Sequence, residues 1–85
     1  MTEVDIWIKV MDKLGFFFIE EKCQPGDTNV LEYVWMPTNH TYRVYFNRKT
    51  EEVNSIFCVI GGVTKQTFYN QYASTFREIK LQQLL

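Results

Sequence analysis

The stretch IFCVIGGVT at residues 56–64 carries the strongest structural signal in the chain. It opens with five consecutive apolar residues, rich in β-branched and aromatic side chains, which predict a strand rather than a helix. Because the run is apolar at every position, both of its faces should be covered, which predicts an interior strand. Gly61 and Gly62 then supply the freedom in φ that a sharp turn needs.

A long amphipathic helix is predicted directly after this turn, over residues 65–83. Thr64 is suited to be its N-cap, because the hydroxyl can accept a hydrogen bond from an N–H of the first turn. An anion could bind at this helix start beside Lys65. The glycine spacing matches neither a phosphate loop nor a dinucleotide site, so a plain strand-to-helix turn is favoured. The apolar side chains of the helix recur at helical intervals and form one stripe: Phe68, Tyr72, Phe76 and Ile79.

The rest of the chain predicts a first helix and three more strands. Thr2 and Asp5 have capping-box spacing before an apolar stripe, and Gly15 fits the end of a helix over residues 3–14. Short loops joining successive strands predict an antiparallel meander. The predicted strands cover residues 16–23, 29–36, 41–47 and 53–60. The fold class is therefore a single α+β domain over residues 1–85, in the order α-β-β-β-β-α.

Composition limits the classes of function. The net charge is −1, and the chain contains two Trp, five Tyr and seven Phe residues. This balance does not indicate a typical nucleic-acid-binding protein, whereas the aromatic content is high for the length. No signal peptide or membrane-spanning run is recognisable, so we expect a soluble cytoplasmic protein without membrane contact, with Cys23 and Cys58 reduced.

Residue types that support catalysis or metal binding are few and poorly spaced. Cys23, Cys58 and His40 are the only soft metal ligands, whereas a structural zinc site usually needs four. Cys58 lies within an apolar strand and His40 in a loop, which disfavours a nucleophile–base pair. Glu20 and Glu21 should point to opposite faces of a strand, which separates their carboxylates. We therefore predict no cofactor, no metal and no enzymatic activity.

The predicted sheet carries more apolar side chains than one face can hold, which leaves two arrangements open. The two helices could cover opposite faces, or both could cover one face and leave the other for a partner. In the second arrangement, aromatic side chains beside basic ones would form a binding surface, with Trp35 as its anchor. The candidate binding residues are Tyr33, Trp35, Arg43, Tyr45, Arg48 and Lys49.

These patterns favour a small regulatory protein that acts through protein–protein contacts, including contacts within a homodimer. Small cofactor-free proteins of this size class include adaptors, antitoxins, immunity proteins and inhibitors encoded by phages or other mobile elements. The alternative is binding of single-stranded nucleic acid or RNA, since aromatic sheet faces flanked by basic residues can stack bases.

Overall fold

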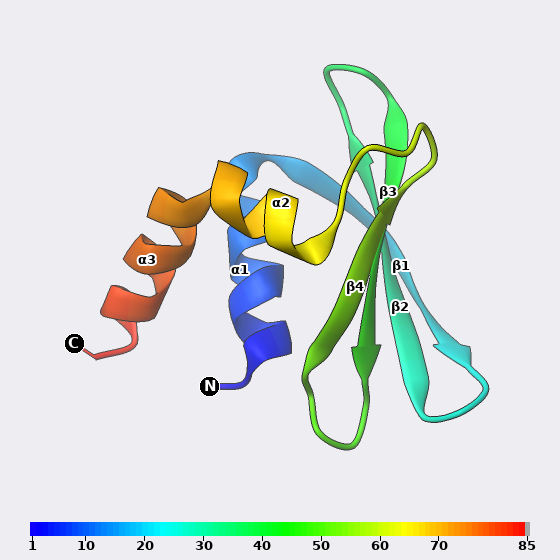
Figure 1. The fold of residues 1–85 in the computed structure, drawn as a ribbon, viewed down its shortest axis with the longest axis horizontal. Helices are drawn as coiled ribbons and strands as arrows, with labels where there is room; N and C mark the ends of the chain where they lie inside the picture. The colour runs from blue at the N-terminus through cyan, green and yellow to red at the C-terminus, as the bar shows by residue number, and fades with distance from the viewer. Residues whose placement is uncertain (85) are drawn as a thin grey trace.

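The computed structural model describes residues 1–84, which form an open sheet and three helices (Figure 1). The fold confirms the predicted α+β class and the antiparallel meander. The elements in chain order are α1 (Glu3–Leu14), β1 (Phe16–Gln24), β2 (Thr28–Trp35), β3 (His40–Asn47), β4 (Val53–Cys58), α2 (Lys65–Gln71) and α3 (Ala73–Gln82).

The first helix begins and ends where its capping residues predict. The Thr2 hydroxyl accepts a hydrogen bond from the Asp5 N–H, and the Asp5 carboxylate accepts one from the Thr2 N–H. The hydrogen bond from the Thr2 N–H to the ionised carboxylate holds the pKa of Asp5 below its usual value. Gly15 ends the helix with φ 91°, a left-handed conformation that favours glycine.

The four strands pair in sequence order, β1-β2-β3-β4, and every neighbouring pair is antiparallel. Glu32 of β2 lies opposite Arg43 of β3, and Tyr33 lies opposite Tyr42. Because successive residues in a strand point to opposite faces, this register sends the Glu32–Arg43 pair and the Tyr33–Tyr42 pair to different faces. It therefore fixes which side chains can form a common surface.

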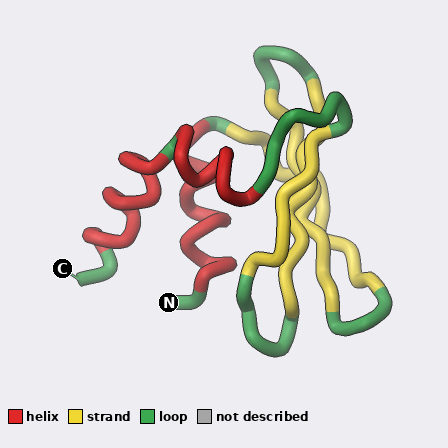
Figure 2. Tube along the Cα trace, viewed as in Figure 1, coloured by secondary structure: helices red, strands yellow, loops and turns green. Residues whose placement is uncertain are grey.

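All three helices lie on the same side of the sheet (Figures 1 and 2). Helix α1 contacts β1 and β4, helix α2 contacts β4, and α3 packs against α1 as an outer layer. The core lies between the helices and the sheet and includes Trp7, Leu31, Val44 and Phe68. No helix within residues 1–84 covers the opposite side of the sheet, which we call the uncovered face. The sequence left open whether the helices cover opposite faces of the sheet or the same face. In the structure they all cover the same face.

The prediction of an interior strand over residues 53–60 is wrong in two respects. Strand β4 lies at an edge of the sheet and ends at Cys58. Ile56 and Cys58 are buried, whereas Phe57, Val59 and Ile60 are exposed. The continuous apolar run therefore reflects one covered face and one uncovered face that is also apolar, not a strand covered on both sides.

The predicted helix over residues 65–83 is divided at Tyr72, which has φ −114° and ψ 28°. The break follows from packing around Trp7, whose ring centroid lies 5.3 Å from that of Phe68 and 4.9 Å from that of Phe76. Two residues eight positions apart in a straight helix are separated by about 12 Å along its axis. The bend at Tyr72 allows α2 and α3 to place both phenyl rings against the same indole.

Candidate functional site

The uncovered face is the candidate binding surface, and the strand register defines its side chains. Val34 of β2 lies opposite Phe17 of β1. Arg43 of β3 lies opposite Glu32 of β2 and Phe57 of β4. The face therefore combines apolar side chains with an ionic centre.

The ionic centre is built around Glu32. The Arg43 Nε donates a hydrogen bond to Glu32 Oε2 at 3.1 Å, and the Lys22 Nζ lies 3.8 Å from the same oxygen. Lys22 also contacts Glu20 Oε1 at 3.2 Å. The hydrogen bond to Glu32 raises the pKa of Arg43. Because these charges neutralise one another, the centre of the face has little net charge to attract a polyanion.

The apolar part of the face is exposed at both edges of the sheet. Phe17 is 58% exposed on β1 and Phe57 is 45% exposed on β4. Val34 and Tyr45 are half-buried between these edges, and Val30 beneath them is almost fully buried. Phe17 and Phe57 are aromatic residues of the kind enriched at protein interfaces, and they lie on the two sides of the ionic centre.

The structure does not bring the six predicted binding residues together. Arg43 and Tyr45 lie on the uncovered face, whereas Tyr33 and Trp35 point to the side that the helices cover. Tyr33 is only 3% exposed, and Trp35 packs against the core. The predicted single platform with Trp35 as its anchor is therefore wrong, because alternation along β2 and β3 separates Tyr33 and Trp35 from Arg43 and Tyr45.

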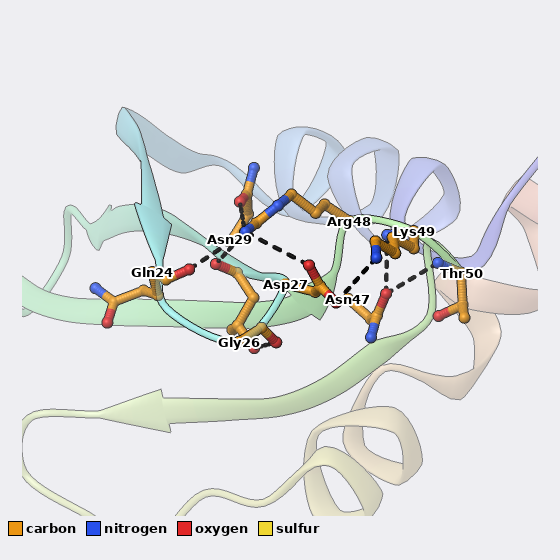
Figure 3. A network of polar contacts seen from close by, with 9 residues as sticks. Gln24, Gly26, Asp27, Asn29, Asn47, Arg48, Lys49 and Thr50 are labelled. Atoms are coloured by element: carbon orange, nitrogen blue, oxygen red, sulfur yellow. Dashed lines mark hydrogen bonds and ion pairs between the residues drawn. The ribbon is translucent and has the colours of Figure 1, made fainter.

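Arg48 and Lys49 lie in the turn after β3, in a polar network that ties the ends of two hairpins together (Figure 3). One Arg48 Nη donates to the backbone carbonyls of Gln24 and Thr28, at 3.2 and 3.0 Å. Lys49 pairs with Asp27 at 3.4 Å, and Arg48 lies 3.7 Å from the other oxygen of that carboxylate. The guanidinium of Arg48 is therefore used to hold the β1–β2 turn against the β3–β4 turn.

Sequence reasoning did not select the exposed residues of β1. Phe17, Phe18 and Ile19 are 58%, 50% and 43% exposed, and only Phe16 of this strand is buried. The register is irregular between Phe18 and Glu20, where a bulge leaves Ile19 without a partner residue on β2. The predicted meander could have indicated this exposure, because the first strand of a meander lies at an edge of the sheet and pairs with a neighbouring strand on one side only.

The residues considered for catalysis and metal binding are dispersed. Cys58 is buried on β4, Cys23 is exposed on β1 at the opposite edge, and His40 begins β3. Among residues 1–84, no three His, Cys, Asp or Glu side chains are grouped so that they could hold a metal ion. None of the helices in this part of the chain is long and apolar enough to cross a membrane.

Comparison of the chain with protein-family models, with curated proteins and with solved structures gave no match. The side chains on the two sides of the sheet are thus the basis for assigning a function.

Proposed function

We propose that this is a non-enzymatic binding protein that acts in the cytoplasm through protein–protein contacts on the uncovered face. One observation carries the proposal: the helices all lie on one side of the sheet, and exposed Phe17 and Phe57 lie on the other. A partner with a complementary apolar surface would bury both rings, whereas the free protein leaves them in water. Such a module suits an adaptor, an antitoxin or immunity protein, or an inhibitor encoded by a phage or other mobile element.

The paired charges support a protein partner over a nucleic acid. Arg43 is engaged by Glu32, Arg48 by backbone carbonyls and Asp27, and Lys49 by Asp27. Nucleic-acid binding depends largely on cations that are available to replace the counterions of phosphates. On a protein interface, by contrast, paired charges can surround apolar anchors and fix the orientation of the partner.

The proposal predicts that Phe17→Ala with Phe57→Ala lowers partner affinity about tenfold or more, because aromatic anchors dominate interface energetics. Tagged wild-type protein and the double variant are compared by quantitative affinity capture from the native host, followed by titration of each captured protein. The matched control is Leu81→Ala with Leu84→Ala, which removes two exposed apolar side chains from the C-terminal part of the described chain. The control variant should bind as the wild type does.

Equal binding by wild type and the Phe17/Phe57 variant would contradict the proposal. The protein would instead be a nucleic-acid-binding protein if nuclease treatment abolished capture and if the protein bound oligonucleotides with an affinity that falls steeply with salt. Light scattering at about 0.1 mM tests whether the partner is a second copy of the chain, in which case the double variant should be monomeric.

A further inference from the structure

A groove of about 550 Å³ lies on the helix side of the sheet, between α1 and the first two strands. Its apolar wall comes from one helical residue and from residues of the first two strands: Ile8, Phe16, Phe17, Phe18 and Leu31. Ile8 is 40% exposed and Phe18 is 50% exposed, so the wall is open to solvent. This is a different surface from the ionic centre of the uncovered face.

Tyr33 is a buried polar side chain that points into this groove. Only 3% of the residue is exposed, and its ring packs edge-to-face against Phe18 with centroids 5.5 Å apart. No hydrogen bond joins the Tyr33 hydroxyl to another of residues 1–84, and because no fully buried polar atom in this part of the chain lacks a partner, the hydroxyl must face the solvent of the groove. The hydroxyl is therefore left free to bond with something in the groove.

Two carboxylates line the groove together with this hydroxyl. Burial, together with the negative charges of Asp12 and Glu21, raises the pKa of Tyr33 to about 12. Asp12 belongs to α1 and Glu21 to β1, and both line the groove. The hydroxyl therefore shares the groove with both acids, whose charges help to raise its pKa.

Neither acid has a cationic partner within the described part of the chain. Glu21 accepts one hydrogen bond, from the Asn29 amide at 2.7 Å, and Asp12 accepts none through its side chain. Lys9 is the one cation lining the groove, and it is close enough to Asp5 to lower that pKa. The groove therefore has an excess of acceptors beside an apolar wall.

A second hollow, of about 580 Å³ between α1 and the C-terminal helices, has a similar size but no such excess. Its Glu3 carboxylate pairs with Lys65 at 3.2 Å. Its Lys80 lies over the ring of Tyr69, 5.2 Å from the centroid. The charged groups of that hollow interact with other side chains of the fold, whereas the carboxylates of Asp12 and Glu21 have no cationic partner in the described part of the chain.

We propose that the groove binds an arginine side chain from an extended segment of a partner protein. The guanidinium donates to the carboxylates of Asp12 and Glu21 and to the oxygen of Tyr33, and its stem packs on Ile8 and Phe18. Arginine fits better than lysine because its planar group carries five donors and can stack on an aromatic ring. An arginine on this side of β1 could be recognised independently of contacts on the uncovered face.

The position of the Tyr33 hydroxyl can be tested without any ligand. Asp12→Asn with Glu21→Gln should lower the pKa of Tyr33 below about 12 but leave it above 10, since burial still disfavours the phenolate. The measurement is a pH titration of the tyrosine Cζ resonance by ¹³C NMR, assigned with Tyr33→Phe. An unchanged Tyr33 pKa in the double variant would place the two carboxylates away from the hydroxyl.

The binding test uses short capped peptides and the full-length ¹⁵N-labelled protein. Acetyl-Leu-Arg-Leu-amide should shift the amide resonances around Asp12, Glu21 and Tyr33 in a saturable way, with a Kd of about 1 mM. The peptide with glutamine in place of arginine should bind at least about tenfold more weakly, and the lysine peptide should bind with intermediate affinity.

Variants assign the binding to the groove. Asp12→Asn with Glu21→Gln should weaken the arginine peptide about tenfold, and Tyr33→Phe about threefold. The matched control is Glu51→Gln with Glu52→Gln, because those exposed carboxylates make no side-chain contacts in the described structure. Phe57→Ala should also bind normally, which separates this site from the one proposed on the uncovered face.

Any of the following three results would overturn the arginine site, as would a fourth from the control variant. They are equal affinity for the arginine and glutamine peptides, wild-type affinity in the Asp12/Glu21 variant, or absence of groove shifts at about 10 mM peptide. An equal loss in the Glu51/Glu52 control would also overturn it, since it would show that only the overall charge matters.

Discussion

Phe68→Ala is expected to destabilise the protein by about 3–5 kcal/mol, the usual cost of removing a buried phenyl ring from a core. Phe68 is 2% exposed and its ring contacts Trp7 of α1, Phe16 of β1 and Phe76 of α3. It therefore connects the sheet, the first helix and the outer helix. For a chain of this size the corresponding fall in melting temperature is roughly 15 °C or more.

Phe57→Ala is the control for this prediction, because it removes the same ring from the uncovered face. Phe57 is 45% exposed, so its loss should change the free energy of unfolding by no more than about 0.5 kcal/mol. Urea denaturation followed by tryptophan fluorescence measures both variants. Similar destabilisation by the two substitutions would mean that Phe57 is covered in the folded protein, which would remove the basis for the proposed interface.

Glu3→Ala is expected to cost about 2 kcal/mol, because it leaves a partly buried backbone N–H of β4 without an acceptor. The Glu3 Oε1 accepts from the Val53 N–H at 2.6 Å and from the Lys65 Nζ at 3.2 Å. Lys65 in turn donates to the Val53 carbonyl at 2.6 Å. The first residues of α1 and α2 thus bond the backbone N–H and the backbone carbonyl of Val53, at the start of the edge strand β4.

Glu3→Gln separates the hydrogen bond from the charge. Glutamine keeps an acceptor oxygen for the Val53 N–H, and the Glu3–Lys65 pair is partly solvated, so we expect a cost below about 1 kcal/mol. Thermal unfolding of both variants gives the comparison. If glutamine were as damaging as alanine, the ionic attraction to Lys65 rather than the backbone hydrogen bond would hold β4 to the helices.

The two edges of the sheet are consequently unlike each other. The start of β4 is closed by Glu3 and Lys65, whereas β1 is exposed along all of its length after Phe16. Long exposed edge strands tend to pair with other chains unless they are blunted, and the bulge at Ile19 is one such device. Both proposed binding surfaces border β1, which makes this strand the part of the molecule where partner contacts should concentrate.

Local signals in the sequence predicted most of the secondary structure. Capping residues gave both ends of α1 and the start of α2, because a Thr hydroxyl and a left-handed glycine act within a few residues of the chain. Short polar loops gave the antiparallel meander, since such loops can join only neighbouring antiparallel strands. The end of β4 and the break at Tyr72 were missed because packing against distant residues decides both.

The candidate surface was predicted less well, for a related reason. Arg43 and Tyr45 were selected together with Tyr33 and Trp35, because nothing local indicated which side of β2 the helices would cover. That choice depends on the direction in which the chain leaves Gly15 and the turn after Cys58. Tyr33 was selected as a surface aromatic, whereas it is buried and exposes only its hydroxyl side to the groove.

The sequence by itself determined the α+β class, the order of the elements and the pairing of neighbouring strands, because these follow from capping, turns and hydrophobic spacing. Only the tertiary structure decided that Ile56 and Cys58 are buried beneath the helices, whereas Phe57 lies on a face that no helix within residues 1–84 covers. The physical reason is that an apolar side chain favours burial but does not determine which helix, strand or partner will cover it. In this chain α1 and α2 cover one face of β4, and the other remains available to a partner.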